Sequence, residues 1–171
     1  MVTRTLFALL VSSLALWAVV AAQSSNCNRL PRQTIEDRAF RQYARVERTD
    51  GTYRLMYLDE RSLETFARTG ALPDGAFIVM ETYYSKDVES TNFTKSRVGG
   101  RWLYGSFSPE RPSFAARADP SCQGCHQTAS PSVAGTFTLP MLQRAVRDGR
   151  VAVTTCNRGG RTPCEPSTYE R

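Results

Sequence analysis

The sequence is short of histidine, since its 171 residues include only one, His126. A zinc site built from three histidines is therefore excluded within this chain, as is a haem held by two axial histidines. A Ser-His-Asp triad would have to use the same histidine. Lysine is scarce as well, because Lys86 and Lys95 are the only two in the chain.

Internal repeats, low-complexity tracts and basic blocks are also missing. With 41% hydrophobic and 22% charged residues, the composition is typical of a globular protein. The net charge of +6 comes from basic residues spread along the chain. This spread argues against nucleic-acid binding, whereas a mild positive charge suits an acidic redox partner or a membrane surface. The sequence leaves the oligomeric state open.

Only one long apolar run is present, Leu6–Ala22, and it contains no glycine, proline or charge. Val20 and Ala22 lie three residues and one residue before a cleavage point ahead of Gln23, which is the pattern of a secretory signal peptide. An uncleaved anchor is the alternative, but a membrane span needs roughly 20 apolar residues and this run is slightly short. We expect residues 1–22 to be removed and the mature chain to be periplasmic or secreted, in an oxidising compartment.

The rest of the chain predicts an α+β fold, an antiparallel β-sheet with flanking helices. A helix is expected from Thr34, because Ile35, Ala39, Tyr43 and Val46 recur at helical spacing. Short runs rich in aromatic and apolar residues predict strands over 52–58, 76–84 and 101–107. Gly99-Gly100 separates the last strand from another extended segment.

Two further helices are expected from their end signals. One is capped by Asp59 and ends at Gly70, and the other is capped by Thr138 and ends near Gly149. The predicted organisation is an N-terminal arm over 23–33, one domain over 34–150 and an irregular C-terminal tail over 151–171.

Three cysteines lie outside the motif described below. Cys156 and Cys164 enclose seven residues and could pair locally. Cys27 would then be unpaired, or it could pair with one of the other two. The sequence leaves both pairings open.

The segment Cys122-Gln123-Gly124-Cys125-His126 is a C-x-x-C-H motif, the attachment pattern of a c-type haem. Two thiols at this spacing can each form a thioether with a haem vinyl group, and the next residue can direct an imidazole at the iron. The alternatives are a disulfide, a thioredoxin-like pair or half of a zinc site. A zinc site would need two more ligands, and the chain has no second histidine. A thioredoxin-like pair opens a helix after a strand, whereas this motif follows a proline-rich loop. We therefore expect one haem c per chain, held by Cys122 and Cys125, with His126 as the axial ligand of the iron.

Several weaker features in fixed order accompany this motif. They are Tyr57-Leu58-Asp59, Thr69-Gly70, Asp74-Gly75, Val79-Met80-Glu81, Trp102 with Phe107, and Phe137-Thr138 after the motif. In this order the chain resembles the cytochrome P-460 and cytochrome c′-beta family over roughly Thr52 to Arg147. The resemblance implies an antiparallel-sheet fold and one covalent haem with histidine on one side. The other side is often open to NO, CO or hydroxylamine.

The P-460 branch carries a lysine cross-linked to the haem edge and oxidises hydroxylamine. The position that matches this lysine is Met80, and neither Lys86 nor Lys95 aligns with it. The c′-beta branch, which lacks the cross-link and binds gases, is therefore the better match.

The resemblance also suggests pocket residues. Arg54 occupies a strand position at which the family tends to carry an arginine facing the distal pocket, although an exposed strand arginine is the alternative. Met80 would contact the haem edge or act as a sixth ligand, and Phe77 and Phe107 would line the pocket. All three residues also fit an ordinary core.

Four functions remain after this reading. The leading one is an exported monohaem cytochrome that binds NO-type ligands. The second is an enzyme that oxidises hydroxylamine or nitric oxide, with Arg54 and Glu81 as catalytic candidates and Asp59 as another nearby acid. The third is a six-coordinate electron carrier that uses the sulfur of Met56, Met80 or Met141. The fourth is a haem-free thiol protein.

Overall fold

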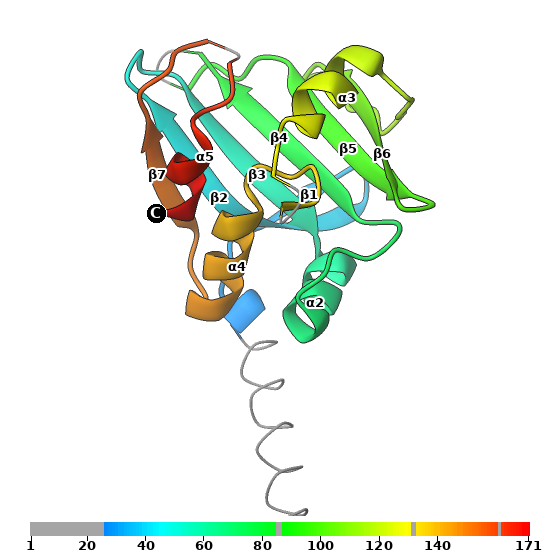
Figure 1. Cartoon of the computed structure of the whole chain (residues 1–171). Helices are drawn as coiled ribbons and strands as arrows, with labels where there is room; N and C mark the ends of the chain where they lie inside the picture. Colours follow the sequence, from blue (N-terminus) through cyan, green and yellow to red (C-terminus); the bar gives the residue numbers. More distant parts are fainter. Residues whose placement is uncertain (1–25, 85–86, 131–132, 161) are drawn as a thin grey trace, which may run out of the picture.

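A seven-stranded sheet dominates the computed structural model, which describes residues 26–84, 87–130, 133–160 and 162–171 (Figure 1). Six strands follow one another in the order of the sequence, and the seventh pairs with β2. Every pair is antiparallel except β2 with β7, which is parallel. The predicted α+β class with a mainly antiparallel sheet is confirmed. The strands are β1 (Arg32–Ile35), β2 (Arg38–Arg48), β3 (Tyr53–Asp59), β4 (Phe77–Tyr83), β5 (Asn92–Val98), β6 (Arg101–Phe107) and β7 (Ala152–Cys156).

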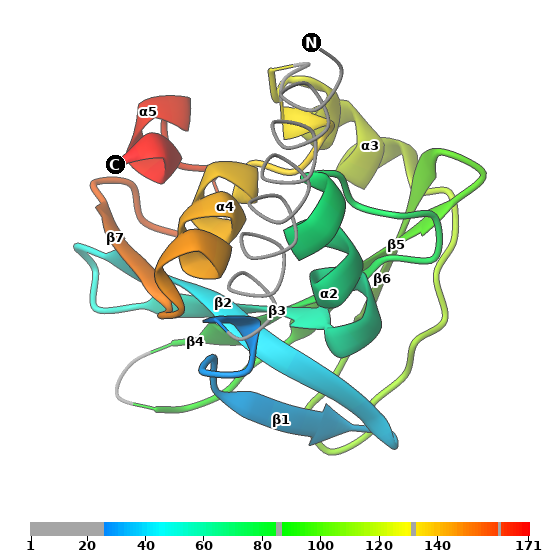
Figure 2. The same ribbon diagram turned by 90° about the horizontal axis from the view of Figure 1, so that it is seen from below.

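The four described helices lie on the same side of the sheet (Figures 1 and 2). They are α2 (Glu60–Thr69), α3 (Pro120–Gln127), α4 (Leu139–Asp148) and α5 (Pro166–Glu170). Among the described residues, no helix combines the length and hydropathy that a membrane span requires. The predicted signal peptide lies outside the described residues.

The prediction of a helix from Thr34 is wrong. These residues form β1, a two-residue turn at Glu36 and Asp37 with φ of 45° and 60°, and the long strand β2. A β-bulge between Gln42 and Ala44 breaks the alternation of β2, so that Tyr43 and Ala44 are both buried in the same core. The helical spacing of Ile35, Ala39, Tyr43 and Val46 was thus misleading, since Ile35 is buried on the opposite face of the sheet from Tyr43 and Val46.

The predicted strands and the two short helices are confirmed, and Asp59 shows why α2 begins where it does. Its carboxylate accepts hydrogen bonds from the backbone N–H of Ser62 at 2.9 Å and of Phe77 at 2.9 Å. One residue thus starts α2 and ties the helix to the first residue of β4. Gly70, with φ of 70°, ends α2 in the left-handed conformation.

The C-terminal segment is more regular than predicted. The part expected to be an irregular tail contains β7, which extends the sheet, and α5. A disulfide joins Cys156 to Cys164, so the local pairing is the one observed. Cys27 is a free cysteine buried in the core beside Leu30, and the expected N-terminal arm is thus anchored at these residues.

The sheet separates two groups of buried side chains. The larger group lies on the helix-covered face, and a smaller one on the opposite face contains Phe40, Tyr57, Phe77, Val79 and Phe107. Because side chains alternate along a strand, the face on which a residue lies decides whether it can reach the site described next.

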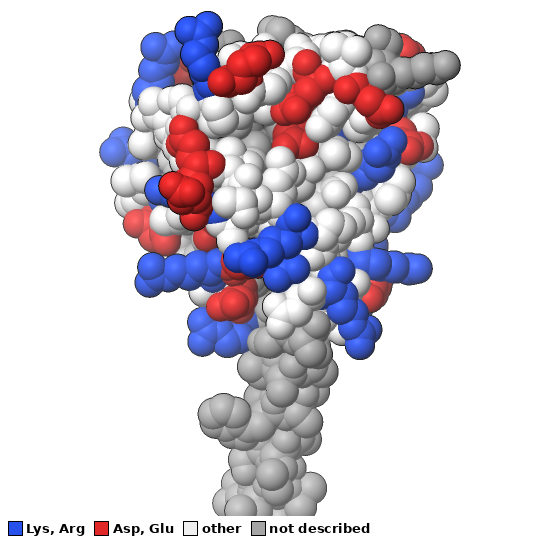
Figure 3. All heavy atoms as spheres, turned by 180° about the vertical axis from the view of Figure 1, so that it is seen from behind, with Lys and Arg blue, Asp and Glu red and all other residues white. Residues whose placement is uncertain are grey.

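The back of the molecule carries side chains of both charge signs, which are scattered over the surface (Figure 3).

Candidate functional site

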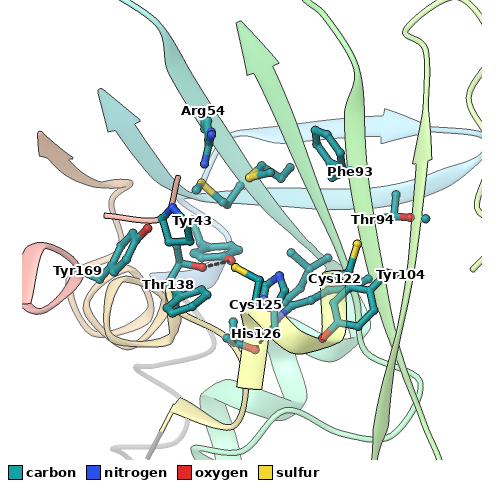
Figure 4. Close-up of a pocket in the computed structure, with 18 residues that line it drawn as sticks. Tyr43, Arg54, Phe93, Thr94, Tyr104, Cys122, Cys125, His126, Thr138 and Tyr169 are labelled. Atoms are coloured by element: carbon teal, nitrogen blue, oxygen red, sulfur yellow. Dashed lines mark hydrogen bonds between the residues drawn. The ribbon is translucent and has the colours of Figure 1, made fainter. Parts of the chain in front are cut away.

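A pocket lies between the helix-covered face of the sheet and the C-x-x-C-H segment (Figure 4). Cys122, Cys125 and His126 all line it. The opposing wall comes from β3 and β4, and further side chains come from β5, from β6 and from the segment before α4. The most important of these residues are Arg54, Met56, Met80, Lys95, Tyr104 and Phe137.

The motif forms most of α3, and a local cap explains why this helix begins there. The Asp119 carboxylate accepts hydrogen bonds from the backbone N–H of Ser121 and of Cys122, both at 3.0 Å. Pro120 follows in the first turn, where its missing N–H costs nothing. Helical spacing then brings Cys122, Cys125 and His126 to one side of α3. Both thiols are free.

The imidazole of His126 is oriented by the backbone. Its Nδ1 lies 2.8 Å from the carbonyl oxygen of Gly135. A carbonyl oxygen can only accept, so Nδ1 carries the proton and Nε2 keeps its lone pair. Burial, followed by the charge of Lys95, lowers the pKa of His126 to about 4, so the ring is neutral at neutral pH. A neutral imidazole whose other nitrogen is fixed is the form that ligates metals.

The donor set fits a haem better than a bare metal ion. Among the described residues, no group of three or more His, Cys, Asp or Glu side chains is placed to hold an ion. A porphyrin supplies four nitrogen ligands, so the chain needs to add only one imidazole. The two free thiols and the lone pair of His126 then match the three attachment points of a c-type haem.

The wall formed by β3 and β4 carries Arg54 and a pair of methionines. Met56 lies directly opposite Met80 in the antiparallel register of β3 and β4, and both line the pocket, as does Arg54. The Arg54 guanidinium donates a 2.7 Å hydrogen bond to the carbonyl oxygen of Gly160. Arg54 and Met80, which the resemblance placed in a pocket, thus line the same pocket as the C-x-x-C-H segment.

Three other predicted site residues lie on the wrong face of the sheet. Phe77 and Phe107 belong to the core of the opposite face and do not line the pocket. Glu81 follows Met80 on β4 and therefore points away from the pocket. Its carboxylate accepts hydrogen bonds from Gln33 at 2.7 Å, Tyr57 at 2.9 Å and Tyr83 at 3.1 Å, and burial raises its pKa.

No carboxylate lines the pocket within the described part of the chain. Asp59, the other acid proposed from the sequence, is engaged as the cap of α2. Neither Glu81 nor Asp59 therefore lies in the pocket, where a proton-transfer residue was expected.

Sequence reasoning missed several residues that the fold brings to the pocket. Tyr43 reaches it because β2 is a strand, and its hydroxyl bonds the hydroxyl of Thr138 at 2.8 Å. Pro163 and Tyr169 come from the segment expected to be irregular. Lys95 lies on β5, where burial lowers the pKa of its amine to about 7. No hydrophobic alternation in the sequence points to Lys95, because its neighbours Thr94 and Ser96 are polar as well.

No protein-family model matches the chain, and no curated protein matches it significantly.

Proposed function

We propose that this chain is an exported monohaem c-type cytochrome that resembles the cytochrome P-460 and c′-beta family and binds small NO-type ligands at an open iron site. One observation carries the proposal: Cys122, Cys125 and His126 face a single pocket from one helix. Both thiols are free, whereas Cys156 and Cys164 are paired with each other.

The environment of His126 supports its role as the axial ligand. The ring is held between Tyr104 and Phe137, with centroid distances of 5.1 Å and 5.4 Å. Its Nδ1–H bonds the Gly135 carbonyl, which leaves Nε2 for the metal. When bound, haem would supply an iron atom able to change oxidation state and to bind NO or CO. The protein would orient the imidazole and exclude water from the apolar part of the pocket.

Arg54 supports the binding of NO-type ligands. Its guanidinium lines the same pocket and carries several N–H donors. Donors of this kind can hydrogen-bond an oxygen-bearing ligand. The oxidation of hydroxylamine or nitric oxide is a weaker proposal, because no carboxylate among the described residues lines the pocket and Met80 stands where the P-460 branch has lysine.

A six-coordinate electron carrier is the second candidate. The observation that favours it is the Met56–Met80 pair, which brings two thioether groups to the pocket wall. Met141 does not line the pocket, since it is fully buried in the core. The reduced protein without added ligand separates the two candidates. A high-spin magnetic circular dichroism spectrum with rapid CO binding indicates the open site, and a low-spin methionine signature indicates the carrier.

The proposal is tested by expressing the full chain with its leader in a bacterium that matures c-type cytochromes. We expect one haem per chain, retained by the denatured protein after acid–acetone extraction. Replacing both thiols, Cys122→Ser with Cys125→Ser, should abolish covalent retention. The control is Cys156→Ser with Cys164→Ser, which removes two cysteines outside the motif and should leave the haem attached. Extraction of the haem from the native protein would contradict the proposal.

A further inference from the structure

Lys95 is a buried lysine without an acidic partner. Its side chain lies on β5, the residue is 7% exposed, and none of the ion pairs among the described residues involves it. Its Nζ donates to the hydroxyl of Thr136 at 2.7 Å and to the carbonyl oxygen of Gly135 at 3.0 Å, and it lies 4.2 Å from the ring centroid of Trp102. Removing an amine from water costs free energy, so the burial of this lysine without an ion pair calls for an explanation.

The Gly135 carbonyl is the acceptor that His126 also uses. His126 Nδ1 lies 2.8 Å from this oxygen, so the imidazole and the lysine amine donate to the same atom. The loop that carries the carbonyl is held in place by Trp102, whose indole N–H donates to the Ala134 carbonyl at 2.9 Å. The shared oxygen is thus fixed relative to both donors.

Two donors on one oxygen weaken each other. The more strongly the Gly135 carbonyl attracts the Nδ1 proton, the more electron density His126 would deliver through Nε2. The amine of Lys95 takes part of the carbonyl's accepting capacity and places positive charge close to the ring. Both effects disfavour imidazolate character, and neutral imidazole is the weaker donor to ferric iron.

We infer that Lys95 is a positioning residue that limits the donor strength of His126, and that it thereby raises the reduction potential of an iron atom held at Nε2 and weakens the iron–histidine bond. The inference rests on the proposed function, because it concerns the same site. A weaker bond to His126 would leave such an iron atom freer to bind a strong ligand such as NO.

The test compares Lys95→Met with the native holoprotein. Methionine has a similar length but cannot donate, so the Gly135 carbonyl would serve His126 alone. We expect the midpoint potential to fall by an amount that corresponds to a roughly tenfold stabilisation of the ferric form, about 59 mV for one electron. The iron–histidine stretching frequency in resonance Raman spectra of the reduced protein should rise. A merely structural role would not move these two readouts together.

Matched variants separate this effect from a general loss of charge or fold. Arg97→Met removes a cation from the same strand, where Arg97 donates to the Leu72 carbonyl at 2.6 Å, and should leave both readouts unchanged. Lys95→Arg keeps a cationic donor and should restore most of the native potential. Lys95→Leu, which also lacks a donor, should behave like Lys95→Met and serves as the test if the methionine variant does not fold.

The outcomes also distinguish this inference from the proposed function. If the native chain retains no covalent haem, the proposed function fails. If all variants carry haem and Lys95→Met or Lys95→Leu has the potential and stretching frequency of Arg97→Met, the haem assignment stands and the role of Lys95 is overturned.

Discussion

At the scale of single residues, the face of a strand decides the role of a side chain. Met80 and Glu81 are neighbours on β4, yet the first lines the pocket and the second is buried on the other side of the sheet. Glu81 there connects three strands, because Gln33 of β1 and Tyr57 of β3 both donate to its carboxylate. Its burial therefore matters for the stability of the sheet rather than for the chemistry of the pocket.

The raised pKa of Glu81 predicts a pH-dependent stability. Burial, which raises this pKa, makes the folded state hold the proton more tightly than the unfolded chain, whose glutamates titrate near pH 4.3. The folded chain then binds more protons than the unfolded one, so stability falls as the pH rises from that value through the raised pKa. Glu81→Gln should remove this fall, with each unit of pKa difference worth about 1.4 kcal/mol.

Urea unfolding of the native chain and of Glu81→Gln between pH 4 and pH 8 measures the effect. We expect the variant to gain stability relative to the native chain as the pH rises. Glu47→Gln, at an exposed carboxylate on β2, is the control for the loss of a negative charge. A difference between Glu81→Gln and the native chain that stays constant over this range would contradict the prediction.

At the scale of the elements, the sequence predicted the strands and helices whose signals are local. Asp59 and Gly70 mark the two ends of α2, and Gly99-Gly100 forms the turn between β5 and β6 with φ of 57° and 75°. In β1 and β2 the local signal was misleading, because residues spaced like a helical face lie on both faces of the sheet. Nor could the sequence show that β7 pairs with β2, because that contact joins distant parts of the chain.

The residues of the candidate site also divide into those that local signals predicted and those whose position depends on distant parts of the chain. The meeting of Cys122, Cys125 and His126 at one pocket could be predicted because it depends on spacing within five consecutive residues. Phe77, Phe107 and Glu81 were misplaced because the choice of face depends on the whole sheet. Lys95 was missed because its partners, Gly135 and Thr136, belong to a loop 40 and 41 residues away.

Gly105 allows a close approach between β6 and the segment that leads to α3. A Cβ at this position would lie 2.3 Å from the carbonyl oxygen of Ala115 and 2.8 Å from Oγ1 of Thr94. Ala115 belongs to the segment that pairs with β6 through Arg117 and then leads to the cap of α3. Gly105→Ala should therefore force this segment away from β6 and lower the stability by about 1–3 kcal/mol, the usual cost of overpacking.

Gly124→Ala is the matched control for this substitution. Gly124 lies within α3, and a Cβ there meets nothing within 4 Å. Alanine in a helix interior is favoured over glycine by roughly 0.5–1 kcal/mol, so this variant should be as stable as the native chain or more stable. Thermal unfolding of both variants checks the pair. Equal stabilities for Gly105→Ala and Gly124→Ala would show that the close approach of Ala115 to β6 carries no cost.

At the scale of the whole molecule, the C-terminal segment completes both the sheet and the pocket. β7 pairs with β2, and Pro163 and Tyr169 then line the pocket beside residues of β3 and β4. The buried Arg48 holds the intervening loop, since its guanidinium donates to the carbonyl oxygens of Arg158 at 2.6 Å and Thr162 at 2.8 Å. The last part of the chain is thus connected to the site by strand pairing, hydrogen bonds and a disulfide.

The disulfide between Cys156 and Cys164 should contribute stability without being needed for the fold. The two cysteines are 8 residues apart, and closing a loop of this size is worth about 2–3 kcal/mol through the entropy of the unfolded chain. Cys156→Ser with Cys164→Ser should therefore lower the free energy of unfolding by this amount. The β2–β7 pairing and the Arg48 hydrogen bonds remain, so the native circular dichroism spectrum should be kept.

A reducing agent provides the control. Dithiothreitol should lower the stability of the native chain to that of the variant and leave the variant unchanged. Cys27→Ala, at a free cysteine, should keep its response to dithiothreitol. If the native chain and the double variant unfold at the same urea concentration under oxidising conditions, the disulfide has no stabilising role, and the strand pairing and the Arg48 hydrogen bonds alone hold Pro163 and Tyr169 at the pocket.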